Sequence, residues 1–204
     1  MGLKLSDYKL IFATVALIGV LLIASPVLAE HLHFPNGEQY SELYLLGPDQ
    51  TPQSIPLNIA TGQNYTVNVG IGDHLGTSAY YVLYVKLRNE TNQLPNQTTG
   101  TPSSLPQLYE YSSLVQNGEN WTAPLTFSVS HISISDNRLV LGSITINNVE
   151  CNVCKIAEFD QQNDGYYYQL FIELWAYNPI SQTFEYQNRF VYFWLNATAA
   201  TSTT

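Results

Sequence analysis

The chain has 204 residues, of which 45% are hydrophobic, 13% aromatic and only 11% charged, and its net charge is −9. This length and apolar content provide the core of one ordinary domain but not of two. The acidic balance argues against nucleic acid as a partner, and a polar surface made mainly of Asn, Gln, Ser, Thr and Tyr changes little with pH.

The N-terminus has the pattern of a secretory signal peptide. Lys4 and Lys9 precede an apolar run over residues 10–24, and the small residues around Ala29 follow it. We predict that residues 1–29 are removed, with an alternative cleavage site after Ala24. A retained transmembrane anchor is the competing interpretation, because residues 10–29 are just long enough to span a bilayer. Either interpretation predicts export.

Two short strand patterns follow, separated by Pro35-Asn36-Gly37. In the first pattern Leu32 and Phe34 alternate with histidines, and the second covers residues 42–46. A self-contained domain needs only one strand to form the first edge of its sheet, and this sequence offers two. We therefore predict an N-terminal tail over residues 27–40, a head over residues 41–197 and a Thr-rich tail over residues 198–204.

The head alternates apolar and polar residues with the period of β-strands rather than of helices. Strand patterns cover residues 65–71, 79–88, 108–115, 125–134, 139–146, 153–159, 166–177 and 184–195. The apolar phase slips at His131, which indicates a bulge. Residues 89–107 are rich in Thr, Asn and Pro and predict a long exposed loop. Many short strands without a helix predict an all-β fold, an antiparallel β-sandwich of immunoglobulin type.

The most aromatic part of the head, residues 166–196, predicts one long hairpin with its turn at residues 178–181. On the return arm, Phe190, Tyr192 and Trp194 fall on one side, while Phe193 and Leu195 make the other side apolar too. We therefore predict that both faces of this arm are covered near its end.

Five Asn-x-Thr sequons occur after the signal segment, at Asn64, Asn89, Asn96, Asn120 and Asn196. In an exported chain they are candidate N-glycosylation acceptors. The alternative is that they are unmodified polar residues of loops and strand ends.

Cys151 and Cys154 are the only cysteines. In an exported chain we predict an intrachain disulfide, which would pin a local turn because its ring is small. Two free thiols, half of a zinc site and a redox dithiol are the alternatives. The zinc site lacks nearby histidines, and the redox motif lacks its βαβ setting.

Two other clusters suggest chemistry, but each has a simpler structural explanation. The segment Asp160–Gly165 offers oxygen ligands for calcium, although a hairpin turn explains it. Asp73-His74 could act in acid–base chemistry, but no nucleophile motif accompanies it, and a solvated loop explains it. We predict no enzyme activity, no cofactor, no metal and no small-molecule substrate.

Several segments carry a resemblance to known proteins. The run Glu42-Leu-Tyr-Leu-Leu-Gly-Pro-Asp49, with Pro56-Leu-Asn58 and Gly62-Gln-Asn-Tyr-Thr-Val-Asn-Val-Gly-Ile71, resembles the opening of an archaeal extracytoplasmic domain of unknown function that is often attached to membrane helices. The likeness continues through Trp121 to Phe193-Trp-Leu-Asn-Ala-Thr198. The whole chain also resembles the subunit of the thread filament of thermoacidophilic archaea.

The second resemblance implies an extracellular cell-surface filament whose subunits polymerise head to tail by donor-strand complementation and carry N-linked glycans. In that case Val27, Leu28, Leu32 and Phe34 form an extended donor strand that fills an open groove of the next subunit. The partners are then further copies of the chain. The alternative is a membrane-tethered extracellular binding or adhesion module.

Overall fold

The computed structural model describes residues 8–9, 12–20 and 39–198. Residues 12–20 are helical. The chain divides into two units, Met1–Glu38 and Gln39–Thr204, and the second unit is the head. Within the described ranges, the structure contains no helix with the length and hydropathy needed to cross a bilayer.

The head is built from strands, which confirms the all-β prediction. The elements are β1 (Tyr40–Leu46), a short 3₁₀ turn η1 (Pro52–Ser54), β2 (Asn58–Ala60), β3 (Tyr65–His74), β4 (Ala79–Asn89), β5 (Tyr109–Val115), β6 (Asn120–Ser135), β7 (Arg138–Ile146), β8 (Val149–Asp160), β9 (Gly165–Asn178) and β10 (Thr183–Thr198). The sequence did not predict β2, because three residues show no alternation.

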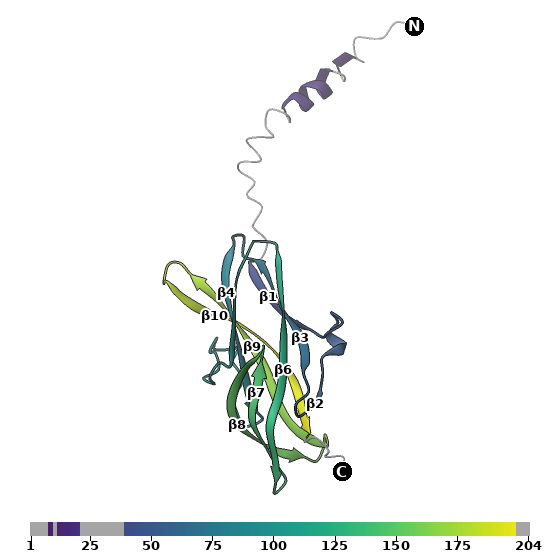
Figure 1. Cartoon of the computed structure of the whole chain (residues 1–204). Coiled ribbons are helices and arrows are strands. Elements are labelled where there is room, and N and C mark those ends of the chain that lie inside the picture. The colour runs from purple at the N-terminus through teal and green to yellow at the C-terminus, as the bar shows by residue number, and fades with distance from the viewer. Residues whose placement is uncertain (1–7, 10–11, 21–38, 199–204) are drawn as a thin grey trace, which may run out of the picture. The chain divides into compact units, whose positions relative to one another are not determined.

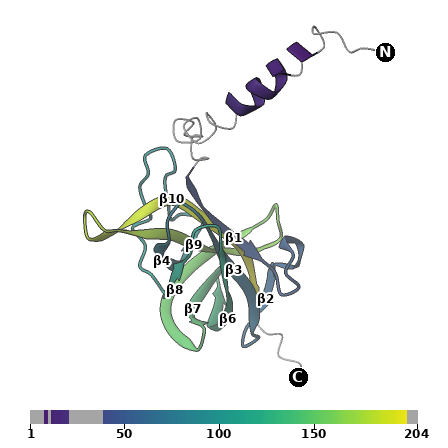
Figure 2. The ribbon, with the colours of Figure 1, turned by 90° about the horizontal axis from the view of Figure 1, so that it is seen from above.

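The strands pair into one curled sheet with two halves (Figures 1 and 2). One half has the order β1-β3-β6-β7-β8, and the other has the order β5-β4-β9-β10-β2. The halves are joined where Phe159 and Asp160 of β8 pair with Tyr166 and Gly165 of β9. All pairs are antiparallel except β10–β2, so the sheet is mixed rather than purely antiparallel as predicted.

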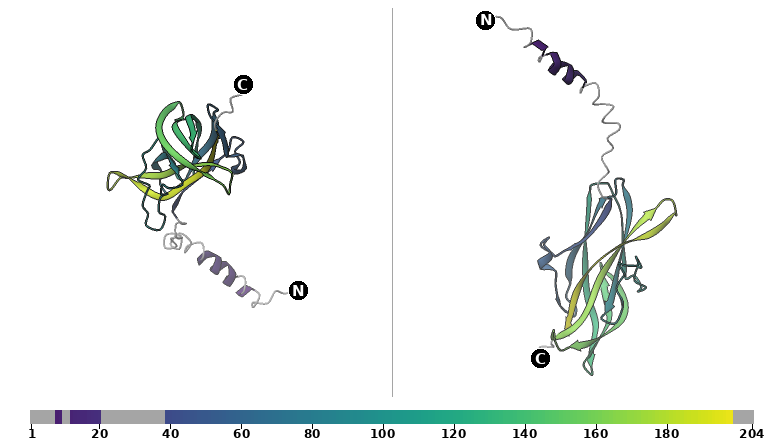
Figure 3. Two further views of the ribbon diagram at one scale, coloured as in Figure 1. Left: turned by 90° about the horizontal axis from the view of Figure 1, so that it is seen from below. Right: turned by 180° about the vertical axis from the view of Figure 1, so that it is seen from behind.

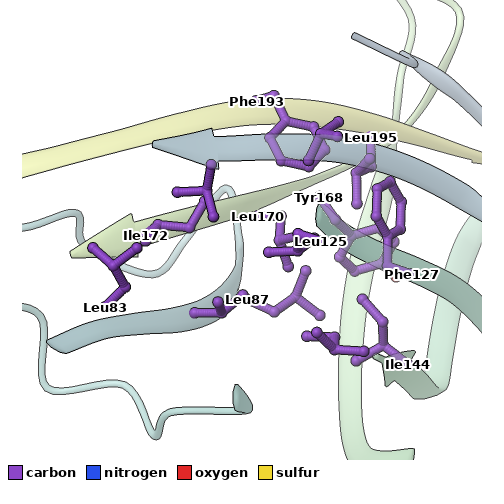
Figure 4. Close-up of a cluster of buried hydrophobic side chains, with 14 of the residues drawn as sticks. Leu83, Leu87, Leu125, Phe127, Ile144, Tyr168, Leu170, Ile172, Phe193 and Leu195 are labelled. Carbon is purple, nitrogen blue, oxygen red and sulfur yellow. The ribbon is translucent and has the colours of Figure 1, made fainter. Parts of the chain in front are cut away.

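The two halves share one core (Figure 4). Leu125 and Phe127 of β6 face Leu170 of β9 and Phe193 and Leu195 of β10, and all five are buried. The rings of Phe127 and Phe193 lie 5.6 Å apart between their centroids and so join the halves directly. Burying a large apolar side chain contributes about 1.5–3 kcal/mol, so this shared core stabilises the packing of the two halves against each other.

Backbone irregularities occur on three neighbouring strands, at His131 of β6, Gly142 of β7 and Cys154 of β8. His131 and Cys154 have φ angles of 54° and 45°. A Cβ on Gly142 would lie 2.8 Å from the carbonyl oxygen of His131, so only glycine fits there. The predicted phase slip at His131 is present and Ile132 turns inward, but the β6–β7 register is unbroken. The register shift lies instead between β7 and β8.

The C-terminal hairpin forms as predicted, from β9, a turn at residues 179–182, and β10 (Figure 3). Its register runs from Thr183↔Asn178 to Asn196↔Tyr167 and shifts once, between Tyr186 and Phe190. Asn188, within that shift, has a φ of 53°. After this irregularity, β10 pairs with β9 in a regular register over residues 190–195.

Candidate functional site

The outer face of β4 and β9 points away from the shared core, yet part of it is buried. Lys86 and Glu173 lie on this face, and their side chains are only 7% and 0% exposed. Lys86 Nζ donates to Glu173 Oε2 at 2.9 Å and to the carbonyl oxygen of Ser103 at 2.8 Å. The N–H of Ser103 donates to Glu173 Oε1 at 2.7 Å, and Trp175 Nε1 donates to Oε2 at 3.2 Å. We call Lys86, Glu173 and Ser103 the polar clamp.

The polar clamp holds the loop that contains Ser103 down on the sheet. Most of residues 89–107 are exposed, as predicted, but part of the loop lies against the sheet and covers the two charged side chains. Arg88 adds a second attachment: Nη1 donates to the carbonyl oxygen of Asn92 at 2.6 Å, and Nε donates to Gln169 Oε1. Partial burial lowers the pKa of Arg88 from its ordinary value, and the nearby Glu90 acts in the opposite direction.

An aromatic row follows the outer face of β10. Phe190, Tyr192 and Trp194 share this face because they are two residues apart. The rings of Phe190 and Tyr192 stack with 6.1 Å between centroids, and the Arg88 guanidinium carbon lies 5.4 Å from the centre of the Trp194 ring. The prediction that both faces of this arm are covered is wrong here, since Tyr192 remains 48% exposed. The loop covers the neighbouring strands but stops short of this row.

Two clefts lie beside the loop. One, of about 470 Å³, is lined mainly by loop residues with amide and hydroxyl groups, among them Asn92, Asn96 and Thr101. The other, of about 590 Å³, lies between the loop and β10 and includes Arg88, Asn96 and Phe190. Both volumes fall within the range of about 300–1,000 Å³ that is usual for small-molecule sites.

β10 also has an open edge. Among the described residues it pairs with β9 on one side, and on the other side it pairs with β2 at only three residues, Asn196–Thr198. The N–H of Asn196 donates to Leu57 on that second side. Because backbone polar groups alternate along a strand, those of Phe190, Tyr192 and Trp194 point the same way and meet no strand. The predicted donor residues Val27, Leu28, Leu32 and Phe34 lie outside the described residues.

The sequon asparagines divide into two groups. Asn64, Asn96 and Asn120 are exposed, and their amide nitrogens form no hydrogen bond with the described part of the chain. In contrast, Asn89 Nδ2 donates to the carbonyl oxygen of Ile156 at 2.9 Å. N-glycosylation modifies this nitrogen, so the folded head offers three unengaged acceptors.

Asn196 has a structural role instead. Its Oδ1 accepts the N–H of Tyr166 at 3.1 Å, and its Nδ2 donates to Asn58 Oδ1 at 3.2 Å. The carboxamide also packs against Gly165, where a Cβ would clash with it. Asn196 thus ties together the starts of β9 and β2, and its place in a sequon does not reveal this.

Cys151 and Cys154 are both free thiols, so the predicted disulfide is absent from this structure. Both belong to β8, where each residue advances the chain by about 3.3 Å. Cys151 is half-buried and its thiol lies 3.3 Å from the carbonyl oxygen of Leu108, whereas Cys154 is exposed. Residues three apart on a strand point to opposite faces, which separates the sulfurs beyond bonding geometry.

Asp73 and Asp160 both close turns. Asp73 is buried, and its two carboxylate oxygens accept the N–H groups of Leu75 and Ala79 at 2.9 and 3.1 Å. The prediction of a solvated loop at Asp73 is therefore wrong. Asp160 accepts the N–H groups of Gln162 and Asn163 at 2.8 and 3.1 Å. Within residues 8–9, 12–20 and 39–198, no three His, Cys, Asp or Glu side chains converge as a metal site would require.

The curled mixed sheet, its pinned loop and its open edge define an all-β domain, with two clefts beside the loop. The chain belongs to the family described as "Domain of unknown function (DUF1616)", which residues 35–141 match over just more than half of the chain. This membership is compatible with the predicted resemblance to an extracytoplasmic domain of unknown function. It carries no information on the predicted likeness to a filament subunit.

None of the curated proteins matches this chain. Similar solved structures include beta-glucosidase from Listeria innocua in complex with glucose, with 14% identity, a TM-score of 0.40 and coverage of 79% of this chain and 16% of that chain. The same enzyme without a named ligand has 14% identity and a TM-score of 0.39, with coverage of 80% of this chain and 17% of that chain. The chain spans less than a fifth of these enzymes' length, and a likeness this weak supports no conclusion about function.

Proposed function

We propose that this protein is a structural subunit of an extracellular filament on an archaeal cell surface, and that it polymerises head to tail. In this proposal the head is an immunoglobulin-type domain that lacks one strand, and residues 27–40 of a neighbouring subunit supply it. The observation that carries the proposal is the open edge of β10, which continues in line from the short parallel strand β2.

An unpaired edge of this length is a ready template for another strand. Beside it, Val191 of β10 and Leu43 and Leu45 of β1 pack against the core but remain half-buried. A strand added along β10 would satisfy the backbone groups of Phe190, Tyr192 and Trp194 and would cover this apolar seam. Such an edge pairs two different surfaces of identical subunits, a contact that does not close on itself and therefore makes a fibre.

The tail has the pattern that this edge requires. Leu32 and Phe34 alternate with His31 and His33 in the sequence, so a strand formed by these residues on the neighbouring subunit would present one apolar face. The head begins at the end where β3 and β4 join, because Tyr40 pairs with His74, whereas β10 ends at the opposite end beside β2 (Figure 1). A tail leaving one end of a head can therefore reach the far end of the next.

The donor assignment is tested by placing charge on the apolar face of the tail. Burial of each side chain is worth about 1.5–3 kcal/mol, so Leu32→Asp with Phe34→Asp should weaken subunit contact by about two to four powers of ten. The matched control, His31→Asp with His33→Asp, adds the same charge to the opposite face and should still polymerise.

Polymerisation is measured by electron microscopy and sedimentation of the purified protein, and a peptide of residues 27–40 should bind the folded monomer and block growth. Normal filaments from the Leu32/Phe34 variant would contradict the proposal. Mass spectrometry of the protein from cells provides a second test: an N-terminus between Ser25 and Glu30 is expected, whereas retention of residues 1–29 in the membrane fraction supports a tethered binding module.

A further inference from the structure

We propose that Asn96 carries an N-linked glycan and that the head itself holds the first sugars of this glycan, in the 590 Å³ cleft between the loop and β10. This inference rests on the extracellular location proposed above, but not on filament formation. It assigns a modification site and a saccharide-binding surface to the same place.

The acceptor is held rigidly. Oδ1 of Asn96 accepts the N–H groups of Thr98 and Thr99 at 2.9 and 3.2 Å. Its main chain pairs with Thr101 in both directions, at 2.8 and 3.0 Å. The carboxamide oxygen is thus turned into its own loop, and Nδ2 has no hydrogen-bond partner in the described part of the chain. A glycan on that nitrogen would begin at a fixed point in the cleft wall.

The lining of this cleft has the chemistry of a site for a neutral sugar. Most of its lining is uncharged, with amide and hydroxyl groups from residues such as Asn92, Gln93 and Thr98 that donate and accept hydrogen bonds. The remaining lining residues are Leu94, Pro95, the aromatic ring of Phe190 and the guanidinium of Arg88. No carboxylate is among the lining residues. Sugar hydroxyls need donors and acceptors in this mixture, whereas a phosphate would need more cations.

The loop that lines the cleft is tied to β10, and an aromatic ring lines the cleft as well. Asn188 Nδ2 donates to the carbonyl oxygen of Gln97 at 2.8 Å, which ties the loop to the irregular stretch of β10. Phe190 lines the cleft and stacks on Tyr192, with 25° between the ring planes. The electron-rich face of an aromatic ring attracts the polarised C–H bonds on the face of a sugar. Phe190 thus connects the cleft to the aromatic row on β10.

The proposal also gives the exposed ring of Tyr192 a neighbour. Phe190 and Trp194 are half-buried, whereas Tyr192 between them remains 48% exposed. A glycan rooted at Asn96 supplies the missing cover from within the same molecule.

The test uses the full-length glycoprotein purified from its source cells, with glycopeptide mass spectrometry and NMR of the attached sugars. Occupancy of Asn96 is expected. The first sugars should show C–H resonances shifted upfield by the ring of Phe190, and this shift should be lost in Phe190→Leu. The matched control is Tyr177→Leu, which removes another exposed ring that lines a different cleft, and it should keep the shift.

Two results would overturn the inference. One is an unmodified Asn96 in the secreted protein, and the other is an occupied Asn96 whose sugar resonances do not differ between the wild type and Phe190→Leu. Filaments are scored separately, so loss of polymerisation in a tail variant that keeps the upfield shift leaves this inference standing.

Discussion

Removing Glu173 should destabilise the head far more than removing an exposed ion pair. In Glu173→Leu, Lys86 keeps the Ser103 carbonyl but loses its counter-charge while remaining buried, and the donors on Ser103 and Trp175 lose their acceptor. Breaking a buried ion pair by removing one partner typically costs about 3–5 kcal/mol. We expect a loss of this size in the free energy of unfolding.

The chain provides its own control. Arg138 Nη2 donates to Glu158 Oε1 at 3.0 Å, almost the same distance as in the buried pair, but those side chains are 60% and 76% exposed. Exposed pairs contribute about 0–1 kcal/mol, so Glu158→Leu should be nearly neutral. The double variant Lys86→Met/Glu173→Leu should recover part of the lost stability, because it leaves no buried charge without a partner.

Urea unfolding measures these free energies, and hydrogen exchange over residues 94–104 reports whether the loop has lifted. We expect Glu173→Leu to speed exchange in the loop, with Glu158→Leu behaving as the wild type. The reasoning is refuted if Glu173→Leu costs no more than Glu158→Leu, or if the loop remains fully protected without the carboxylate.

Three further predictions concern other parts of the head. Tyr168→Phe removes a buried hydroxyl that lies 2.7 Å from the Leu139 carbonyl oxygen and 3.0 Å from that of Lys155, and should lower the free energy of unfolding by about 1–3 kcal/mol in urea titrations; an unchanged midpoint would show that these contacts add nothing. Gly165→Ala forces the Asn196 carboxamide out of place, and overpacking of this kind costs about 1–3 kcal/mol, which thermal unfolding should detect; an unchanged Tm would show that the carboxamide moves aside without cost. Finally, hydrogen bonds from Asn163 hold the pKa of Asp160 below its ordinary value of 3.8, so its stabilising contribution is present above that value and is lost as the pH falls below it. The Tm should therefore drop below about pH 4, and a drop of the same size in Asp160→Asn would show that Asp160 takes no part.

Local patterns predicted the strands well, because alternation is written into neighbouring residues. The C-terminal hairpin and the inward turn of Ile132 after His131 are examples. The polar clamp could not be predicted in the same way. Glu173 alternates with Phe171 and Trp175, as an exposed acid on a mixed face would. Its burial depends on a loop whose contact point, Ser103, is 70 residues away.

The sequons are a second case in which the local sequence does not determine the role of a residue. The three-residue pattern around Asn96 and that around Asn196 are equivalent in sequence, but the cross-strand neighbours of each asparagine decide its role. Asn196 is drawn into contacts with Tyr166 and Asn58, whereas the nitrogen of Asn96 stays free. The one available hint was position, because Asn196 lies inside a strongly alternating strand, where a side chain has fixed neighbours.

The direction of the strands determines how the head responds to pulling. β1 begins and β10 ends at opposite ends of the head (Figure 1), and their terminal residues Tyr40 and Thr198 pair with His74 and Ala60. Tension applied between them runs along β1 and β10 rather than across them. The hydrogen bonds that tie β1 to β3 and β10 to β9 are then loaded in shear, all together, and not opened one at a time as in a zip. A head with this arrangement resists stretching until whole ladders give way at once.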